Sequence, residues 1–146
     1  MKAAIIYTSV TGNTSTLADI IHERMEKRGI DTDLIPIDEF HANQLKEYDL
    51  IAVGTYSWDN GDLPLEMEDL YEAFEIEDVK HVTTGVFGTG DSFYPYFCGA
   101  VDLFRDMLYV HTNLAVTLKV ELMPQDDDLD RCDKFCDRLT RELIPA

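Results

Sequence analysis

The sequence predicts an α/β fold, a doubly wound parallel sheet of five strands with helices on both faces. Short apolar runs alternate with amphipathic stretches along the 146 residues, and this alternation is typical of strand–helix units in a parallel sheet. The length suits one domain, and no repeat, low-complexity tract or linker interrupts it. We therefore expect a single domain over residues 1–146.

Hydrophobic period and turn residues define the expected elements of the first third of the chain. Residues 2–7 are a short apolar run, typical of a buried strand. Apolar side chains recur every four residues in 13–28 and predict a helix, and Gly29 follows where helices commonly end on glycine. Residues 31–37 alternate as a strand does, and the polar residues 38–47 leave room for one helical turn.

The rest of the chain continues the alternation. Pro64 suits the first turn of a helix, with Leu65 as the first residue of its apolar face. Three aspartates at 126–128 stand where the positive end of a helix dipole favours them. The remaining expected elements are a strand over 48–54, a helix from 64 to about 74, a strand over 80–87, a helix over 99–109, a strand over 114–122 and a helix from 124 to about 143.

The charge of the chain excludes some classes of partner. Lys and Arg number 12 against 29 Asp and Glu, so the formal net charge is −17. Such a surface repels nucleic acid and anionic membranes and favours basic partners. The N-terminus does not have the pattern of a signal peptide, and no apolar run approaches the roughly 20 residues of a membrane span. We expect a cytoplasmic protein and, by default, a monomer.

Cysteine and histidine are not spaced as metal ligands. Cys132 and Cys136 stand one helical turn apart without a matching pair elsewhere, and the four histidines are scattered. The third cysteine, Cys98, fits a buried structural thiol. An odd cysteine count in an acidic chain without a signal peptide favours reduced thiols, so we assign no metal site and no disulfide.

The loop after the first expected strand has the composition of an anion site. The stretch YTSVTGNTSTLA at 7–18 is rich in hydroxyl and amide side chains, contains no cation and leads into a helix. Backbone N–H groups at a helix start bind anions, so this loop suits a terminal phosphate. It lacks the Gly-Lys-Ser/Thr of a Walker A loop and the G-x-G-x-x-G of a dinucleotide fold. A polar helix cap without a ligand is the alternative.

Two more loops follow the third and fourth strands, at the same edge of the expected sheet. The loop over 55–64 holds the only tryptophan of the chain, Trp58, which taken alone suits a core side chain better than a stacking platform. The glycine-rich loop over 88–99 holds four aromatic residues, of which Phe97 is assigned to the core and the others cannot all be buried. One phosphate loop and two aromatic loops suit a flat aromatic ring that carries a phosphate.

These motifs resemble flavodoxin along essentially the whole chain. The resemblance rests on T-S-x-T-G-N-T after the first strand, S-W in the second loop and G-x-G-D-S-x-Y-x-Y-F-C-G-A-V-D in the third. The last strand lacks the insertion of the long-chain group, so the short-chain type is implied. The resemblance implies the strand order 2-1-3-4-5, one non-covalently bound FMN, one-electron transfer without enzymatic activity, and protein partners with basic docking faces, namely a reductase and acceptor enzymes.

The resemblance also implies roles for individual residues. The first loop would hold the FMN phosphate, with Val10 contributing only its N–H. Trp58 and Tyr94 would flank the two faces of the ring, and Asp91 would face its pyrimidine edge. The residues expected at the cofactor are Thr8, Ser9, Val10, Thr11, Gly12, Asn13, Thr14, Thr55, Tyr56, Ser57, Trp58, Asp59, Asn60, Gly61, Gly88, Thr89, Gly90, Asp91, Tyr94, Phe97 and Cys98.

The redox properties implied by the resemblance depend on charge and on one peptide. Acidic side chains near the ring oppose the negative charge of a fully reduced flavin and lower its potential. In flavodoxins a carbonyl just after the first aromatic residue turns toward the flavin on reduction, and glycine often follows that residue because it allows both conformations. Here Asp59 and Asn60 follow Trp58. Our hypothesis is that Asp59–Asn60 is the peptide that flips and that Asp59 restrains it.

Other functions of the same topology fit less well. A phosphoacceptor domain needs an aspartate at the end of the third strand, and a small phosphatase needs a cysteine in the first loop, and the chain has neither. The serious alternative is an FMN-dependent NAD(P)H or quinone reductase. Two aromatic residues that cover both ring faces would block the approach of a nicotinamide.

Overall fold

A five-stranded parallel sheet forms the middle layer of the computed structural model, which describes residues 1–58 and 60–141. Its strand order is β2-β1-β3-β4-β5, as the resemblance implies. The strands are β1 (Ala3–Tyr7), β2 (Thr32–Pro36), β3 (Leu50–Tyr56), β4 (Thr83–Gly90) and β5 (Asn113–Glu121). The helices are α1 (Asn13–Lys27), α2 (Glu68–Ile76), α3 (Gly99–His111) and α4 (Asp126–Thr140), with short 3-10 helices η1 (Ile37–Glu39), η2 (Ala42–Glu47) and η3 (Leu65–Met67).

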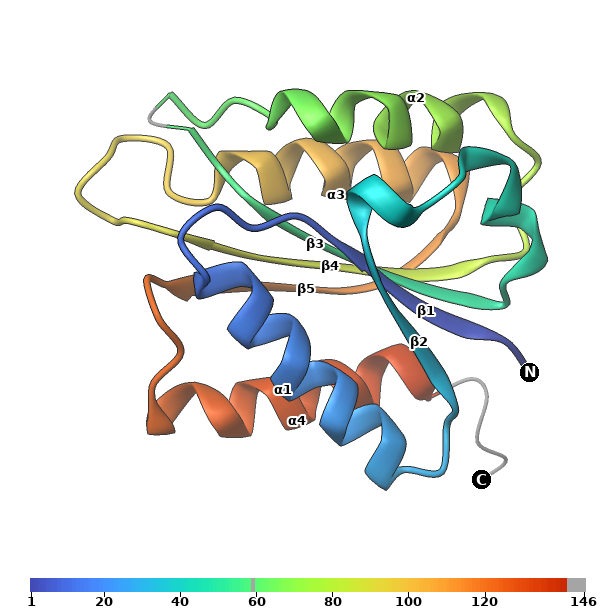
Figure 1. Ribbon diagram of the computed structural model, residues 1–146, viewed down its shortest axis with the longest axis horizontal. Helices are drawn as coiled ribbons and strands as arrows, with labels where there is room; N and C mark the ends of the chain where they lie inside the picture. Colours follow the sequence, from blue (N-terminus) through green and yellow to red (C-terminus); the bar gives the residue numbers. More distant parts are fainter. Residues whose placement is uncertain (59, 142–146) are drawn as a thin grey trace.

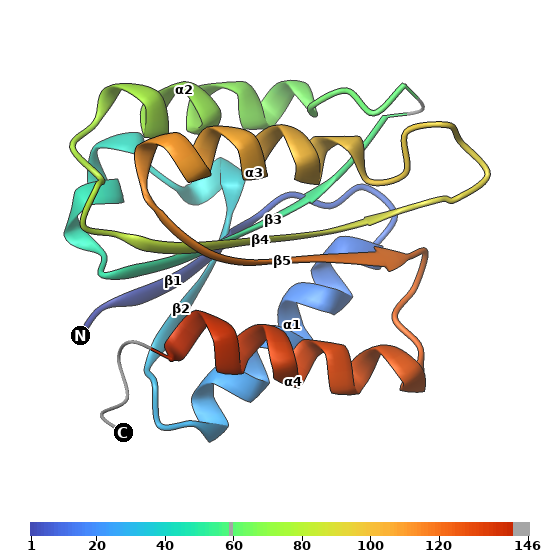
Figure 2. The same cartoon turned by 180° about the vertical axis from the view of Figure 1, so that it is seen from behind.

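Helices cover both faces of the sheet. Figure 1 shows α2 and α3 on one face and α1 and α4 on the other, and Figure 2 shows the same three layers from behind. The apolar run of β1 serves both layers: Ile6 belongs to the core under α2 and α3, and Ile5 to the core over α1 and α4. A strand buried on both faces needs a continuous apolar run instead of an alternating one, which is what residues 3–6 provide.

Several element boundaries differ from the sequence-based prediction, and those nearest the carboxyl edge of the sheet matter most. Strand β3 continues to Tyr56 and β4 to Gly90, because their ladder runs on through the pair Tyr56↔Thr89. The segment after Pro64 opens as the 3-10 helix η3, and the α-helix begins only at Glu68. Leu65, expected on the apolar face of that helix, is instead 75% exposed. The last helix is described to Thr140, and its expected end near 143 falls outside the described residues.

The end of α1 and the burial of Cys98 agree with the prediction. Gly29 has φ +77°, and the N–H groups of Gly29 and Ile30 donate to Glu26 and Met25, which closes the helix as predicted. Cys98, Cys132 and Cys136 are buried and unbridged. In the described part of the chain, none of the helices has the length and apolar character that crossing a membrane requires.

Candidate functional site

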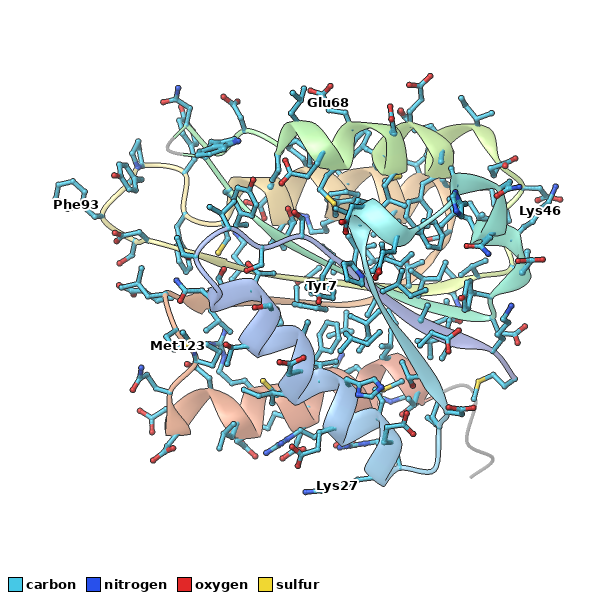
Figure 3. The ribbon with its side chains drawn as sticks, in the orientation of Figure 1. Tyr7, Lys27, Lys46, Glu68, Phe93 and Met123 are labelled. Carbon is cyan, nitrogen blue, oxygen red and sulfur yellow. The ribbon has the colours of Figure 1, made fainter. Side chains whose placement is uncertain are left out.

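Three loops gather at the carboxyl edge of the sheet, on the left of Figure 1. They follow β1, β3 and β4, and we call them the first loop (residues 8–12), the second loop (57–64) and the third loop (91–98). Figure 3 shows Phe93 projecting from the tip of the third loop and Met123 on the same side of the molecule, whereas Lys46 lies at the opposite end. Segments far apart in the sequence therefore form one surface, where ligands of such folds bind.

A hollow of about 260 Å³ lies between these loops. Its lining comes from all three loops and from the strand ends that precede them. The lining residues are Val10, Thr11, Asn13, Thr14, Tyr56, Ser57, Trp58, Thr89, Gly90, Asp91 and Leu122. The hollow combines hydroxyl and amide groups at the start of α1 with aromatic side chains from the end of β3, which suits a ligand with an anionic end and a flat end.

The start of α1 has free capacity for an anion. Gly12 is the N-cap residue, with φ +93°, and no side chain in the described part of the chain caps the helix. The first turn contains no acidic residue, although the N–H groups of a first turn have no acceptor within their helix. Helix α4 differs, since Gln125 and Asp128 form a reciprocal capping box at its start. The polar side chains of the first loop therefore do not serve as a helix cap. This disfavours the alternative that the loop is only a polar cap and binds no ligand.

An unpaired hydroxyl in the first loop supports the same conclusion. Ser9 Oγ is buried and has no hydrogen-bond partner among the described residues. A buried polar atom without a partner is unfavourable unless a ligand or water completes it. The donor groups here, hydroxyls and backbone N–H without a cation, match the oxygens of a phosphate ester. The residues present thus fit the phosphate end of FMN.

A pair of buried hydroxyls joins the first turn of α1 to the end of β4. Thr14 Oγ1 and Thr89 Oγ1 are 2.6 Å apart, and the two residues are 1% and 3% exposed. Both residues also line the hollow. The pair connects the anion-binding end of the site to the strand that carries the third loop.

The second loop presents Trp58 to the hollow and not to the core. Trp58 is 53% exposed, so the interpretation as a core side chain is wrong. Its ring lies 5.4 Å from the ring of Tyr56 at 88°, an edge-to-face pair. The turn is tight: the N–H of Gly61 donates to the carbonyl of Trp58 at 2.7 Å. The Trp58 ring is therefore held in place by the turn that contains it and by the ring of Tyr56.

The second loop is also joined to the start of α3. Ser57 Oγ accepts a hydrogen bond of 2.9 Å from the N–H of Ala100, in the first turn of that helix. Gly61 packs so closely on the third loop that an added Cβ would lie 2.6 Å from Cβ of Tyr96 and 3.3 Å from Cα of Gly99. The positions of the second and third loops are thus coupled on both sides of Trp58.

The third loop exposes three of its aromatic residues. Phe93, Tyr94 and Tyr96 are 85%, 39% and 63% exposed, whereas Phe97 packs against the core, as predicted. Tyr94 forms an edge-to-face pair with Phe93 and is not part of the lining. Asp91 Oδ1 accepts a hydrogen bond from the N–H of Phe93, which fixes the turn at the start of the loop. Three large exposed aromatics in one loop suit a ring-binding and docking role.

Cys98 lies behind the third loop and takes no part in its surface. It is 1% exposed, and its Sγ lies 3.8 Å from the carbonyl oxygen of Gly88. Burial raises the pKa of its thiol to about 12. The thiol is therefore protonated at neutral pH and serves packing, as predicted.

The expected cofactor residues divide into two groups. Those brought together around the hollow are Val10, Thr11, Asn13, Thr14, Tyr56, Ser57, Trp58, Thr89, Gly90 and Asp91. Those placed beside it are Thr8, Ser9, Gly12, Thr55, Asn60, Gly61, Gly88, Tyr94, Phe97 and Cys98. Ser9 and Gly12 line a neighbouring hollow of about 550 Å³ on the β2 side of the first loop. Asp59, and with it the peptide expected to flip, lies outside the described residues.

Two residues of the site were missed by the sequence analysis. Leu122 lines the hollow from the end of β5, and the rule that ligands bind at carboxyl ends of strands would have pointed to it. Glu66, in η3, accepts hydrogen bonds from Thr8 Oγ1 at 2.8 Å and from the hydroxyl of Tyr56 at 2.7 Å, both through Oε2. Partial burial and the bond to Glu66 raise the pKa of Tyr56, so Tyr56 stays a donor.

The chain matches a family model described as Flavodoxin over residues 5–134. Among curated proteins, it is 41% identical to probable flavodoxin 1 of Bacillus subtilis (strain 168) over 138 residues, which covers 92% of this chain and 87% of that protein. It is 35% identical to a flavodoxin of Maridesulfovibrio salexigens, covering 88% and 91% of the two chains.

Solved structures of similar fold agree with these matches. Oxidised flavodoxin 1 from Bacillus cereus superposes with a TM-score of 0.90 at 35% identity, over 99% of this chain and 100% of that one. Oxidised flavodoxin 2 from the same organism gives a TM-score of 0.91 at 34% identity, over 97% and 99% of the two chains.

Proposed function

Because the chain belongs to the flavodoxin family, it is an FMN-dependent electron carrier and not an enzyme, and we propose that the hollow between its three loops is where FMN binds. When bound, FMN supplies the one-electron chemistry. The observation that carries the assignment is the start of α1, whose residues Asn13 and Thr14 line the hollow and which has no side-chain cap from the described residues. The site belongs to one FMN-binding domain over residues 1–146.

The start of α1 holds the phosphate end of the cofactor. Thr11, Asn13 and Thr14 offer side-chain donors, and the N–H groups of the first turn add the positive end of the helix dipole. No lysine or arginine of residues 1–58 and 60–141 lines the hollow, so binding there depends on hydrogen bonds that are directed at fixed oxygen positions. Val10, 65% exposed, contributes its N–H and covers the loop.

The aromatic end of the hollow holds the flavin ring. Trp58 offers one face as a stacking platform, with Tyr56 supporting it at the edge. Tyr94, in the third loop, flanks the ring from the other side once that loop closes on the ligand, and its 39% exposure leaves it free to do so. Among the described residues that line the hollow, Asp91 is the acid. Its charge and the net charge of −17 oppose further negative charge beside them, which lowers the reduction potential of a bound flavin.

The protein exchanges electrons with redox partner proteins, and those partners present basic docking faces. The support is electrostatic: 29 acidic residues against 12 basic ones give an overall negative field, which steers positively charged surfaces toward the carrier. Phe93 projects from the tip of the third loop, at the edge where the ring would be approached (Figure 3), and Tyr96 of the same loop is also exposed. The reductase considered as an alternative is not favoured, since curated relatives that match at least 88% of this chain are flavodoxins.

A titration with FMN followed by slow anaerobic reduction tests this function. The cofactor-free protein is expected to bind one FMN per chain, with quenching of Trp58 and of the flavin, because the two rings stack. Reduction monitored by visible absorption is then expected to proceed in two separate one-electron steps. A single two-electron step with turnover of NADPH would favour the reductase, and absence of FMN binding would refute the assignment of all three loops.

A further inference from the structure

We propose that Thr89 is a positioning residue for the phosphate end of the site, because its hydroxyl donates a hydrogen bond to Thr14 and leaves the Thr14 proton directed at the ligand. The proposal rests on the proposed function and adds to it a residue that does not itself need to touch the phosphate. Thr89 lies at the end of β4, 75 residues along the chain from Thr14 in the first turn of α1.

The pair can be arranged in two ways. Each hydroxyl carries one proton and two lone pairs, and the 2.6 Å separation of the oxygens leaves room for one proton between them. If Thr14 donates, the proton of Thr89 needs another acceptor, and no hydrogen bond of Thr89 Oγ1 other than this one is found in residues 1–58 and 60–141. Both side chains are almost fully buried, so an unpaired proton there is unfavourable.

If Thr89 donates, the proton of Thr14 is left free in the first turn of α1, the place where the anion is expected, whereas Thr89 lies at the end of β4. An anion at the start of α1 selects this arrangement, because an oxyanion accepts a proton and is repelled by a lone pair. The bond from Thr89 then polarises the Thr14 hydroxyl and strengthens its donation to the anion. Thr89 thereby fixes the direction of a donor at the phosphate end.

A second threonine pair joins the same strand to the end of α3, and in this pair the direction of the hydrogen bond is already decided. Thr84 Oγ1 and Thr112 Oγ1 are 2.7 Å apart and buried. Thr112 Oγ1 also donates to the carbonyl of Leu108 at 2.7 Å, so its single proton is used and Thr84 must be the donor within the pair. The chain thus contains a complete relay of hydroxyl, hydroxyl and oxygen acceptor. At Thr89 and Thr14 the first two members are present, and the ligand phosphate supplies the third.

The test compares the affinity of FMN with that of riboflavin, which has the same ring and no phosphate. Thr89→Val removes the hydroxyl with little change of volume. We expect this variant to lose about fivefold in FMN affinity, the effect of one weakened hydrogen bond, and to bind riboflavin as the unmodified protein does. Thr89→Ser retains the hydroxyl and is expected to restore the FMN affinity. Thr89→Ala serves as a second variant without the hydroxyl, should valine disturb the strand.

Two matched variants separate positioning from packing. Thr84→Val removes a buried hydroxyl from the same strand and is expected to leave the ratio of FMN to riboflavin affinity unchanged. In a protein that already carries Thr14→Val, adding Thr89→Val is expected to cause no further loss of FMN affinity, because Thr89 acts only through Thr14.

The proposal is overturned, with the FMN site left intact, if Thr89→Val loses the same affinity for FMN and for riboflavin. It is also overturned if this variant keeps its full affinity for FMN. If the unmodified protein binds riboflavin and FMN with equal affinity, both this proposal and the phosphate assignment of the proposed function fail. If it binds neither flavin, the whole site assignment fails.

Discussion

The hydroxyl of Tyr56 and the carboxylate of Glu66 are joined by a 2.7 Å hydrogen bond that reaches from the end of β3 to η3. The same carboxylate oxygen accepts from Thr8 at the end of β1, so one side chain ties two strand ends together. The ring of Tyr56 in turn meets the edge of Trp58. Glu66 therefore restrains the platform on which we place the flavin ring, although it lies outside the hollow itself.

Loss of this restraint is expected to loosen Trp58. Because Trp58 is the only tryptophan of the chain, its fluorescence anisotropy reports on this side chain alone. We expect Tyr56→Phe and Glu66→Ala to lower the anisotropy of the cofactor-free protein and to weaken FMN binding by about threefold, the effect of one modest hydrogen bond. Glu66→Gln keeps an acceptor oxygen and is expected to lie between these variants and the unmodified protein.

Glu68→Ala is the matched control, since Glu68 is an exposed acid only two residues away, at the start of α2 (Figure 3). It removes a negative charge without touching Tyr56. If Glu68→Ala lowers the anisotropy as much as Glu66→Ala, charge rather than the hydrogen bond controls Trp58, and the restraint assigned to Glu66 is wrong.

Glu66 also gives the protein a defined pH dependence. Partial burial acts to raise the pKa of Glu66, but hydrogen bonds from Tyr56, from its own backbone N–H and from Thr8 outweigh it and leave the pKa below the ordinary 4.5. The folded state therefore holds this carboxylate ionised at pH values where the unfolded chain already binds a proton. Its contribution to stability is complete above about pH 5.5, one unit above the ordinary pKa, and is lost as the pH falls through the folded-state pKa.

The measurement is the free energy of unfolding of the unmodified protein and of Glu66→Gln between pH 7 and pH 3. The difference between the two proteins is expected to stay constant down to about pH 5.5 and to shrink below it. Glutamine does not titrate, so other carboxylates cancel in the comparison. A difference that grows on acidification would show that the pKa of Glu66 is raised in the folded protein, contrary to the hydrogen bonds found.

The strands and helices that position the site could be predicted from the sequence, because the sequence patterns that mark them are local. The apolar run of β1, the four-residue period of α1 and Gly29 at its end each depend on neighbours within a few residues. The strand order followed from the motif resemblance, and the carboxyl-edge rule then placed the three loops together. Ten of the expected residues line one hollow for this reason.

The parts that were missed depend on contacts between distant segments. Glu66 meets Thr8 across 58 positions of sequence, and Thr14 meets Thr89 across 75, so no local pattern marks either pair. Strand β4 was predicted to stop at residue 87, because Gly88 and Gly90 weaken a strand signal; pairing with β3 and β5 extends it. Trp58 taken alone suggested a core residue, and only the turn around Gly61 shows why it is exposed.

Electron transfer to a basic partner is expected to slow as salt is added. At a net charge of −17, electrostatic attraction raises the rate of encounter with a basic partner at low ionic strength. At 0.1 M salt the screening length is about 10 Å, so the attraction no longer acts over longer distances. With a basic cytochrome c as the acceptor, we expect the second-order rate of the reduced carrier to fall about tenfold between 0.02 and 0.3 M salt. Ferricyanide, an anion, is the control, and its rate should rise over the same range. Parallel salt dependences for the two acceptors would contradict electrostatic docking.

Gly61 holds the second and third loops together, and a single methyl group is expected to separate them. Its φ of +79° is a conformation that other residues adopt at a cost of about 1–2 kcal/mol. In addition, an added Cβ would meet Cβ of Tyr96 at 2.6 Å and Cα of Gly99 at 3.3 Å, so Gly61→Ala must displace the third loop. Gly29 provides the control, since it has nearly the same φ, +77°, and an added Cβ would have nothing within 4 Å.

Both variants therefore place an alanine at a positive φ, and only in Gly61→Ala does the added Cβ also collide with neighbouring atoms. We expect Gly29→Ala to lower the free energy of unfolding by about 1 kcal/mol and to leave FMN affinity unchanged. Gly61→Ala should lower stability by about 1–3 kcal/mol more, as overpacking does. It should also weaken FMN and riboflavin binding equally, because the collision lies at the aromatic end of the site. A selective loss of FMN affinity in Gly61→Ala would mean that the second loop acts on the phosphate end, and the division of the hollow into two ends would have to be abandoned.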